Sequence, residues 1–111
     1  MQVDKKETYT IIRPEDDCDQ RFFSSLKKQI FNFSKEHLII DFTTLDTVEV
    51  DDLLQFFDIA IEKRTKHTSF VLVASGLSID EIPDNLIVTP TLKEAQDILE
   101  MDAIERDLMG L

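Results

Sequence analysis

The sequence has very little of the material from which enzyme signatures are built. Gly76 and Gly110 are its only glycines, which excludes a Walker A loop and a glycine-rich dinucleotide fingerprint. Its two histidines, His37 and His67, are far apart and lack the paired spacing of zinc ligands. We therefore expect surface or structural roles for both histidines, and neither a cofactor nor a bound metal.

Cysteine and long apolar runs are also scarce. Cys18 is the only cysteine, so no disulfide can form within the chain. Its neighbours Asp16, Asp17 and Asp19 disfavour the thiolate, although a helix start would favour it, and we expect an unreactive thiol. Residues 1–20 lack the apolar core of a signal peptide, and no apolar run approaches the ~18 residues of a membrane span. These features predict a soluble cytoplasmic protein.

Basic residues are outnumbered by acidic ones. The chain has 12 lysines and arginines against 23 aspartates and glutamates, which gives a formal net charge of −11. A surface of this charge repels nucleic-acid backbones and anionic membranes, so we expect neither as a partner. The simplest interpretation is a solubilising surface, while attraction to a basic patch on a protein partner stays open.

Predicted strands and helices alternate along the 111 residues, a length suited to one domain with one core. This alternation predicts a single α/β domain, residues 1–111, with crossover connections between strands. Residues 76–85 are expected to be mostly loop, with at most one helical turn. The expected strands are 2–4, 7–14, 37–42, 69–75 and 86–90, and the expected helices are 18–34, about 50–63 and 91–110.

Each predicted helix has apolar residues at helical spacing. We assign the aromatic stripe of the first helix to the core rather than to a cofactor pocket. Asp17 with Gln20, and Thr91 with Glu94, have the spacing of a capping box, and Gly110 is a plausible helix end. The stripes are Phe22, Leu26, Ile30 and Phe33; Val50, Leu53, Leu54, Phe57 and Ile61; and Leu92, Ala95, Ile98 and Leu99.

Apolar residues continue in the last predicted helix beyond Leu99. They are Met101, Ile104 and Leu108, again at helical spacing. Two interpretations are open. These side chains extend over the core, which is our expectation, or they form an exposed stripe for a partner helix or a second copy of the chain.

The segment "VEVDDLLQFF", residues 48–57, places three acids just ahead of an apolar helical stripe. Together with Asp46, the carboxylates of Glu49, Asp51 and Asp52 are the best enzyme candidate, because oxygens at this spacing can bind Mg²⁺. The alternative is an ordinary helix start, since acids at helix N-termini complement the helix dipole. We expect the helix start rather than a small metal-dependent enzyme.

The order of elements and two segments resemble the STAS domain, the module of sulfate transporters and anti-sigma-factor antagonists. The run "LIIDFTTL" is similar to the family strand that ends in an Asp-Leu-Ser-like step. "SFVLVAS" and "LIVTPTLKEAQDILEMDAIERDL" resemble later family elements. The resemblance covers residues 6–108 and implies one sheet of four to five mostly parallel strands with helices. The family's Asp-Ser-Ser-Gly-Leu motif, which opens the second helix, falls here on Glu49, Val50, Asp51, Asp52 and Leu53.

Two departures from the family pattern matter. The family's phosphorylated serine falls at Asp51, or at Asp52 if the alignment shifts by one residue, and no hydroxyl remains in the motif. The third family helix has little room in residues 76–85, so we expect it to be shortened or missing.

The resemblance implies a binding module rather than an enzyme. In partner-switching members, a kinase-type anti-sigma factor binds the unmodified domain and phosphorylates the serine, and the added charge disfavours the complex. Asp51 would place permanent negative charge there, or Asp51 or Asp52 would simply cap the helix. We hypothesise a non-catalytic bacterial regulatory module that binds a protein constitutively through residues 49–53.

Overall fold

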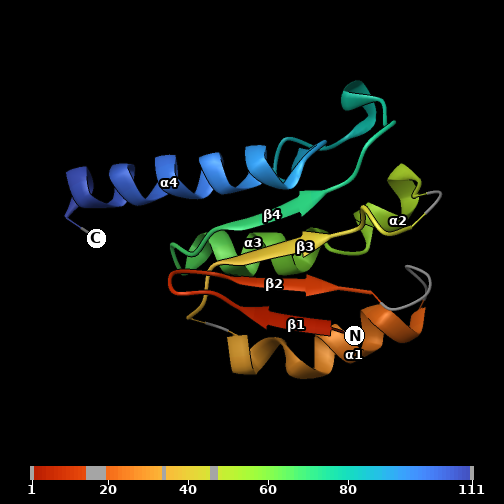
Figure 1. Ribbon diagram of the computed structural model, residues 1–111, viewed down its shortest axis with the longest axis horizontal. Coiled ribbons are helices and arrows are strands. Elements are labelled where there is room, and N and C mark those ends of the chain that lie inside the picture. Colours follow the sequence, from red (N-terminus) through yellow and green to blue (C-terminus); the bar gives the residue numbers. More distant parts are fainter. Residues whose placement is uncertain (1, 15–19, 34, 46–47, 111) are drawn as a thin grey trace.

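Five strands form one mixed sheet in the computed structural model, which describes residues 2–14, 20–33, 35–45 and 48–110 (Figure 1). Their order is β1-β2-β3-β4-β5; β1 is antiparallel to β2, and the remaining neighbours are parallel. The predicted α/β class with a mostly parallel sheet is therefore confirmed. The strands are β1 Gln2–Lys5, β2 Thr10–Arg13, β3 Leu38–Asp41, β4 Phe70–Val73 and β5 Ile87–Thr89.

The helices follow the predicted order, with one additional break. Cys18 and the Asp17 cap predicted for the first helix lie outside the described residues. None of the helices described is long and apolar enough to cross a membrane. The helices are α1 Gln20–Gln29, continued by a 3-10 turn η1 Ile30–Phe33; α2 Val50–Leu54; α3 Phe57–Thr65; a 3-10 turn η2 Ile79–Glu81; and α4 Leu92–Met109.

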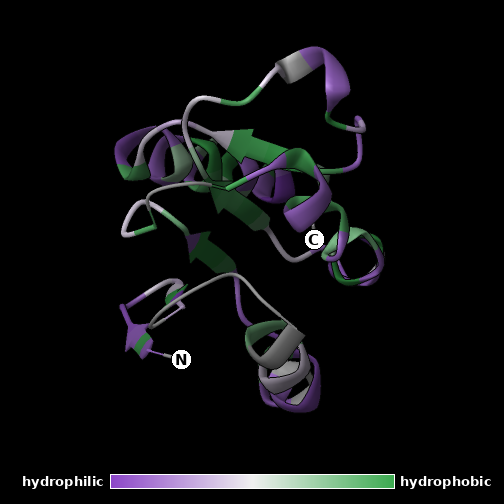
Figure 2. Cartoon of the chain, turned by 90° about the vertical axis from the view of Figure 1, so that its right-hand side faces the viewer, coloured by the Kyte–Doolittle hydropathy of each residue, from purple (hydrophilic) through white to green (hydrophobic). Residues whose placement is uncertain are grey.

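The two faces of the sheet are covered unequally. Strand order follows chain order, so crossovers of one hand place their connections on one face. Side chains of α1, α2, α3 and residues 77–86 pack there, around Leu38 and Ile40. On the opposite face, Ile39 lies in a smaller cluster completed by α4. Figure 2 shows the hydrophobic central strands and, around them, helices that mix hydrophilic and hydrophobic residues.

The larger cluster is rich in aromatic rings. Phe22, Phe42 and Phe56 pack with their ring centroids 5.7 to 6.1 Å apart. Phe33 and Leu26 are buried beside them. The aromatic stripe of the first predicted helix is therefore core, as expected, although the side chain of Ile30 lies outside the description.

The second predicted helix is in fact two helices, and two of its predicted core residues are exposed. A turn at Gln55 and Phe56 separates α2 from α3. Leu54 and Ile61, predicted to face the core, are 39% and 41% exposed. Ile59 is buried instead, together with Phe56 and Ala60. The predicted stripe was therefore wrong at Leu54 and Ile61, whereas Phe57 packs against the larger core cluster, as expected.

The crossover from β4 to β5 contains no α-helix. Every residue of the segment 74–86 is described, and its only helical structure is the 3-10 turn η2. Leu77, Ile82 and Leu86 pack against the larger core cluster in place of a helix. A crossover between parallel strands needs about a dozen residues, and this segment is just long enough.

Candidate functional site

The carboxyl ends of the parallel strands form the first candidate site, because ligands of open α/β sheets usually bind at this edge. Asp41 ends β3 there and is only 3% exposed. Its Oδ2 accepts a hydrogen bond from Nε of Arg13 at 3.0 Å. Its Oδ1 accepts from the backbone N–H of Thr43 at 2.9 Å and from the Thr43 hydroxyl at 2.7 Å. Asp41 is thus engaged in shaping the turn that leads towards α2.

Sequence reasoning missed this network. The sequence does contain a feature that indicates the turn: Asp41 interrupts the apolar run "LIIDF", and Thr43 follows two residues later. That spacing is typical of an Asx-type turn. The contribution of Arg13 is not visible in the sequence, because it comes from the neighbouring strand.

The start of α2 explains the acids of "VEVDDLLQFF". Glu49 is the N-cap residue, with extended backbone angles. Asp52, at the third helical position, accepts a hydrogen bond from the Glu49 backbone N–H at 2.9 Å. The expectation that Asp51 or Asp52 is the cap residue is therefore wrong, because the helix begins at Val50. Asp52 still closes the first turn, from inside the helix.

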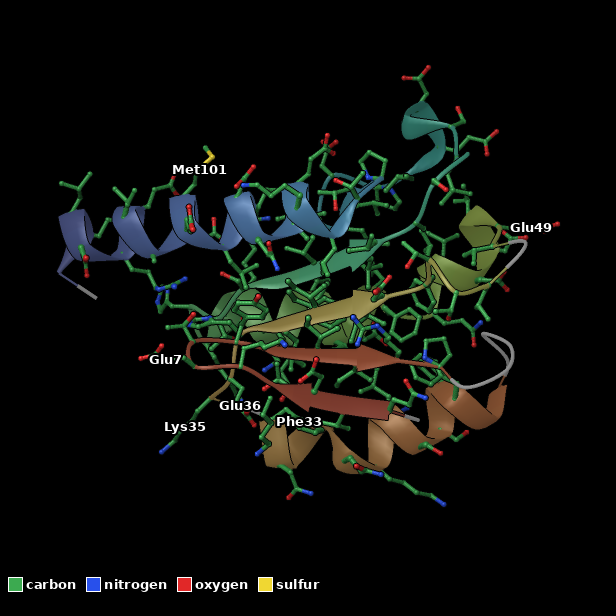
Figure 3. All side chains as sticks on the ribbon, viewed as in Figure 1. Glu7, Phe33, Lys35, Glu36, Glu49 and Met101 are labelled. Carbon is green, nitrogen blue, oxygen red and sulfur yellow. The ribbon has the colours of Figure 1, made fainter. Side chains whose placement is uncertain are left out.

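Residues 49–53, on which the family motif falls, divide into an inner and an outer set. Leu53 is fully buried in the core, and Val50 and Asp52 are half-buried. Glu49 and Asp51 are exposed, and the Glu49 side chain points away from the body of the molecule in Figure 3. The outer set therefore presents negative charge at the carboxyl edge of the sheet.

The start of α2 faces the β4–β5 crossover across a hollow of about 370 Å³. Glu81 contributes a further carboxylate to its lining, opposite Glu49 and Asp51. Leu77 and Val48 supply apolar surface at its base, and both also pack against the core. The hollow is an open depression with acidic residues in its lining rather than an enclosed pocket.

The proposed magnesium ligands are not brought together in the part of the chain that the structure describes. Asp46 lies outside it. Asp52 is already hydrogen-bonded to the Glu49 backbone. Within residues 2–14, 20–33, 35–45 and 48–110, no three histidine, cysteine, aspartate or glutamate side chains converge as a metal site would require.

A second polar cluster lies at the amino ends of the strands. The Ser69 hydroxyl donates to Asp102 Oδ2 at 2.7 Å and accepts from Arg106 Nη1 at 3.2 Å. The Ser69 backbone N–H donates to His37 Nδ1 at 3.0 Å. Burial, helped by the charge of Arg106, lowers the pKa of His37, which keeps the ring neutral. His67 lies apart in the turn after α3, exposed and with φ of +60°.

This cluster contains serine, histidine and aspartate without the geometry of a catalytic triad. A triad requires the histidine to accept the serine hydroxyl proton. Here the hydroxyl donates to Asp102, and His37 accepts from a backbone amide. The cluster instead attaches α4 to the start of β4.

Lys63 is a buried charge that sequence reasoning also missed. Only 2% of the residue is exposed. Its Nζ donates to the carbonyl of Phe33 and, at 2.6 Å, to the carbonyl of Glu36. Burial lowers the pKa of Lys63 from 10.5 to about 8, against an opposing contribution from the Glu36 carboxylate. Lys63 lies on the inward face of α3, three residues after Ala60, and the predicted stripe of this helix gave no sign of it.

The second half of α4 corrects another expectation. Met101, Ile104 and Leu108 do not extend over the core; they are 61%, 60% and 83% exposed. Ala95 and Leu99, in the first half, are the buried residues of this helix. The N-cap Thr91 and the left-handed Gly110 stand where the sequence predicts them. Thus the stripe is exposed, and its role in binding a partner helix or a second copy stays a prediction.

No model of a known protein family matches this chain, and no curated protein matches it. Its function is therefore inferred from the geometry of the α2 edge and of α4.

Proposed function

We propose that the chain is a non-catalytic regulatory module of the STAS-like type, which binds a protein partner through the start of α2. The observation that carries this proposal is the exposed pair Glu49 and Asp51 at the carboxyl edge of the sheet. Buried Leu53 holds this pair in place from below. The partner would be a regulator with a basic surface; a kinase-type anti-sigma factor would need such a surface too, because charge at this position disfavours the usual family complex.

Three features of the fold support the STAS-like assignment. The sheet is mostly parallel with one antiparallel edge strand, β1. The Asp41–Thr43 turn leads from β3 towards α2, where the family places its Asp-Leu-Ser-like step. The β4–β5 crossover carries a 3-10 turn in place of the third family helix, in line with a shortened member.

Asp51 is the residue on which the regulatory part of the proposal rests. It is the second residue of α2 and its side chain is exposed, near the amino end of the helix dipole. A carboxylate there is charged permanently, whereas a phosphoserine is charged only after modification. Partner binding by this chain would therefore not depend on phosphorylation.

Affinity purification from the native cell tests the proposal with one substitution and a matched control. Asp51→Asn removes the charge at the start of α2, whereas Asp58→Asn removes an exposed charge in the first turn of α3. We expect a partner that the wild-type chain and Asp58→Asn retain and that Asp51→Asn loses. If Asp51→Asn retains every partner of the wild type, the start of α2 is not the binding surface.

Two further measurements separate this proposal from its rivals. Incubation of the wild-type chain with the purified partner and ATP should leave residues 47–53 unmodified, and phosphate there would contradict a permanently set switch. The metal-dependent enzyme predicts that millimolar Mg²⁺ or Mn²⁺ raises the melting temperature, because a ligand that binds only the folded state stabilises it. We expect an unchanged melting temperature.

A further inference from the structure

The outer face of α4 carries an apolar stripe that the fold does not use. Met101, Ile104 and Leu108 are spaced three and four residues apart, so they lie on one side of the helix. With about 100° between successive residues, that side is roughly opposite to buried Ala95. Figure 3 shows Met101 pointing away from the sheet. Three large apolar side chains, each 60% exposed or more, therefore form a continuous outward stripe.

The helix cannot bury this stripe by rotating about its axis. On the inward side of its second half, Asp102 and Arg106 are both hydrogen-bonded to Ser69. In the first half, Leu99 and Ala95 fill the small core on the same side. Rotation would break the two hydrogen bonds and expose the two core residues. The outward position of the stripe is consequently a fixed property of the fold.

The borders of the stripe are acidic. The sequence of α4 contains six acidic residues and two basic ones. Of the two basic residues, Lys93 pairs with Asp97 at 2.7 Å in the first turns, and Arg106 is directed towards Ser69. The exposed acids of the helix are Glu94, Asp97, Glu100, Glu105 and Asp107. The stripe is thus apolar in the middle and negative on both sides.

A groove continues the stripe on one side of α4. It has a volume of about 860 Å³ and lies between the helix and the turn that joins β1 to β2. Its lining includes Leu99, Ala103 and Ile104 from the helix and Tyr9 from that turn. Ile104 belongs to both the stripe and the groove, so a bound side chain could pass from one to the other.

We propose that the outer face of α4 binds an amphipathic helix of another protein, with lysine or arginine on both sides of its own apolar stripe. Charge decides between this occupant and a second copy of the chain. Two copies would bring acidic borders together, each on a molecule of net charge −11, and like charges in contact disfavour association. A basic helix offers apolar contact and opposite charge at the same time.

This surface is independent of the one proposed at α2. Figure 1 shows the second half of α4 and the start of α2 at opposite ends of the long axis of the molecule. Substitutions at one end leave the other end in place. Failure of either binding surface can therefore be distinguished from failure of the other.

The test uses synthetic helical peptides of about 20 residues, long enough to form a stable amphipathic helix when stapled. One peptide has leucines on a single side with flanking lysines, and a second has the same composition with its leucines spread around the helix. The full chain is compared with the double substitution Ile104→Gln and Leu108→Gln, which keeps the charge and good helix propensity. Ile61→Gln, at a similarly apolar exposed site on α3, is the matched control.

We expect the amphipathic peptide to bind the wild-type chain and Ile61→Gln, with affinity that falls as salt is added. The double substitution should weaken this binding about tenfold or more. The peptide with spread leucines should bind the wild-type chain no better than the amphipathic peptide binds the double variant. Equal binding of the amphipathic peptide to the double variant would overturn the proposal. A wild-type dimer that the double substitution dissociates, without peptide binding, would overturn it in favour of self-association.

Discussion

Arg13 Nε lies 3.0 Å from Asp41 Oδ2, and this contact joins the carboxyl ends of β2 and β3. The other oxygen of Asp41 holds Thr43 through its backbone N–H and its hydroxyl. One buried carboxylate therefore fixes both the pairing of two strand ends and the turn that leads towards α2. The position of Glu49 and Asp51 at the candidate binding edge depends on it.

Asp41→Ala should lower the unfolding free energy by about 3 kcal/mol, because it leaves the Arg13 guanidinium and the Thr43 donors without their acceptor. Urea unfolding measures this change. Asp4→Ala is the control, since Asp4 approaches the same Arg13 at 3.9 Å but is half-exposed; its cost should stay below about 1 kcal/mol. Equal costs for the two variants would mean that Asp41 has no special structural role.

Lys63 should make stability rise with pH in an alkaline window. The pKa of Lys63 in the fold is about 8, against an ordinary value of 10.5. Between these values the unfolded chain binds more protons than the folded chain, so this group's contribution to the unfolding free energy increases with pH. Lys63→Met removes the titration. The unfolding free energy of the wild type relative to Lys63→Met should grow from pH 8 to 10.5. If the unfolding free energies of both proteins change with pH in the same way, the lowered pKa is contradicted.

His37 should make stability fall on mild acidification. Its pKa is lowered below 6.5 in the fold, chiefly by burial, so the stabilisation is complete above pH 6.5 and is lost as the pH falls towards the folded pKa. Protonation of Nδ1 would also remove the acceptor for the Ser69 N–H. His37→Asn keeps an acceptor near that position and does not titrate. The unfolding free energies of the two proteins should diverge below pH 6.5. A difference that stays constant with pH would exclude His37 as the source of the pH dependence.

The two halves of α4 should respond differently to truncation of apolar side chains. Leu99→Ala removes a buried side chain and should cost about 2 to 4 kcal/mol of unfolding free energy. Leu108→Ala removes one that is 83% exposed and should change it by less than about 0.5 kcal/mol. Thermal or urea unfolding distinguishes the two. A large loss of unfolding free energy in Leu108→Ala would mean that the stripe contributes to the stability of the fold.

Local signals in the sequence were enough to predict most elements. The Thr91 cap and the Gly110 end of α4 depend on backbone donors and a left-handed φ within a few residues, so they are visible in the sequence. The fully buried strands were visible as apolar runs. The exposed positions of Leu54 and Ile61 were not visible, because helical spacing alone does not say which apolar residues of a run face the sheet.

By itself the sequence determined the α/β alternation, the ends of α4 and the absence of a phosphorylatable hydroxyl from residues 49–53, because each is a property of neighbouring residues. The tertiary structure alone decided which charges meet and which apolar side chains stay outside. Arg13 reaches Asp41, and Lys63 reaches the end of η1, only because separate strands and helices pack together. Met101, Ile104 and Leu108 remain exposed because Asp102 and Arg106 occupy the inward positions of α4. Helical spacing identifies a stripe, whereas packing against a particular sheet decides whether that stripe faces the core or a partner.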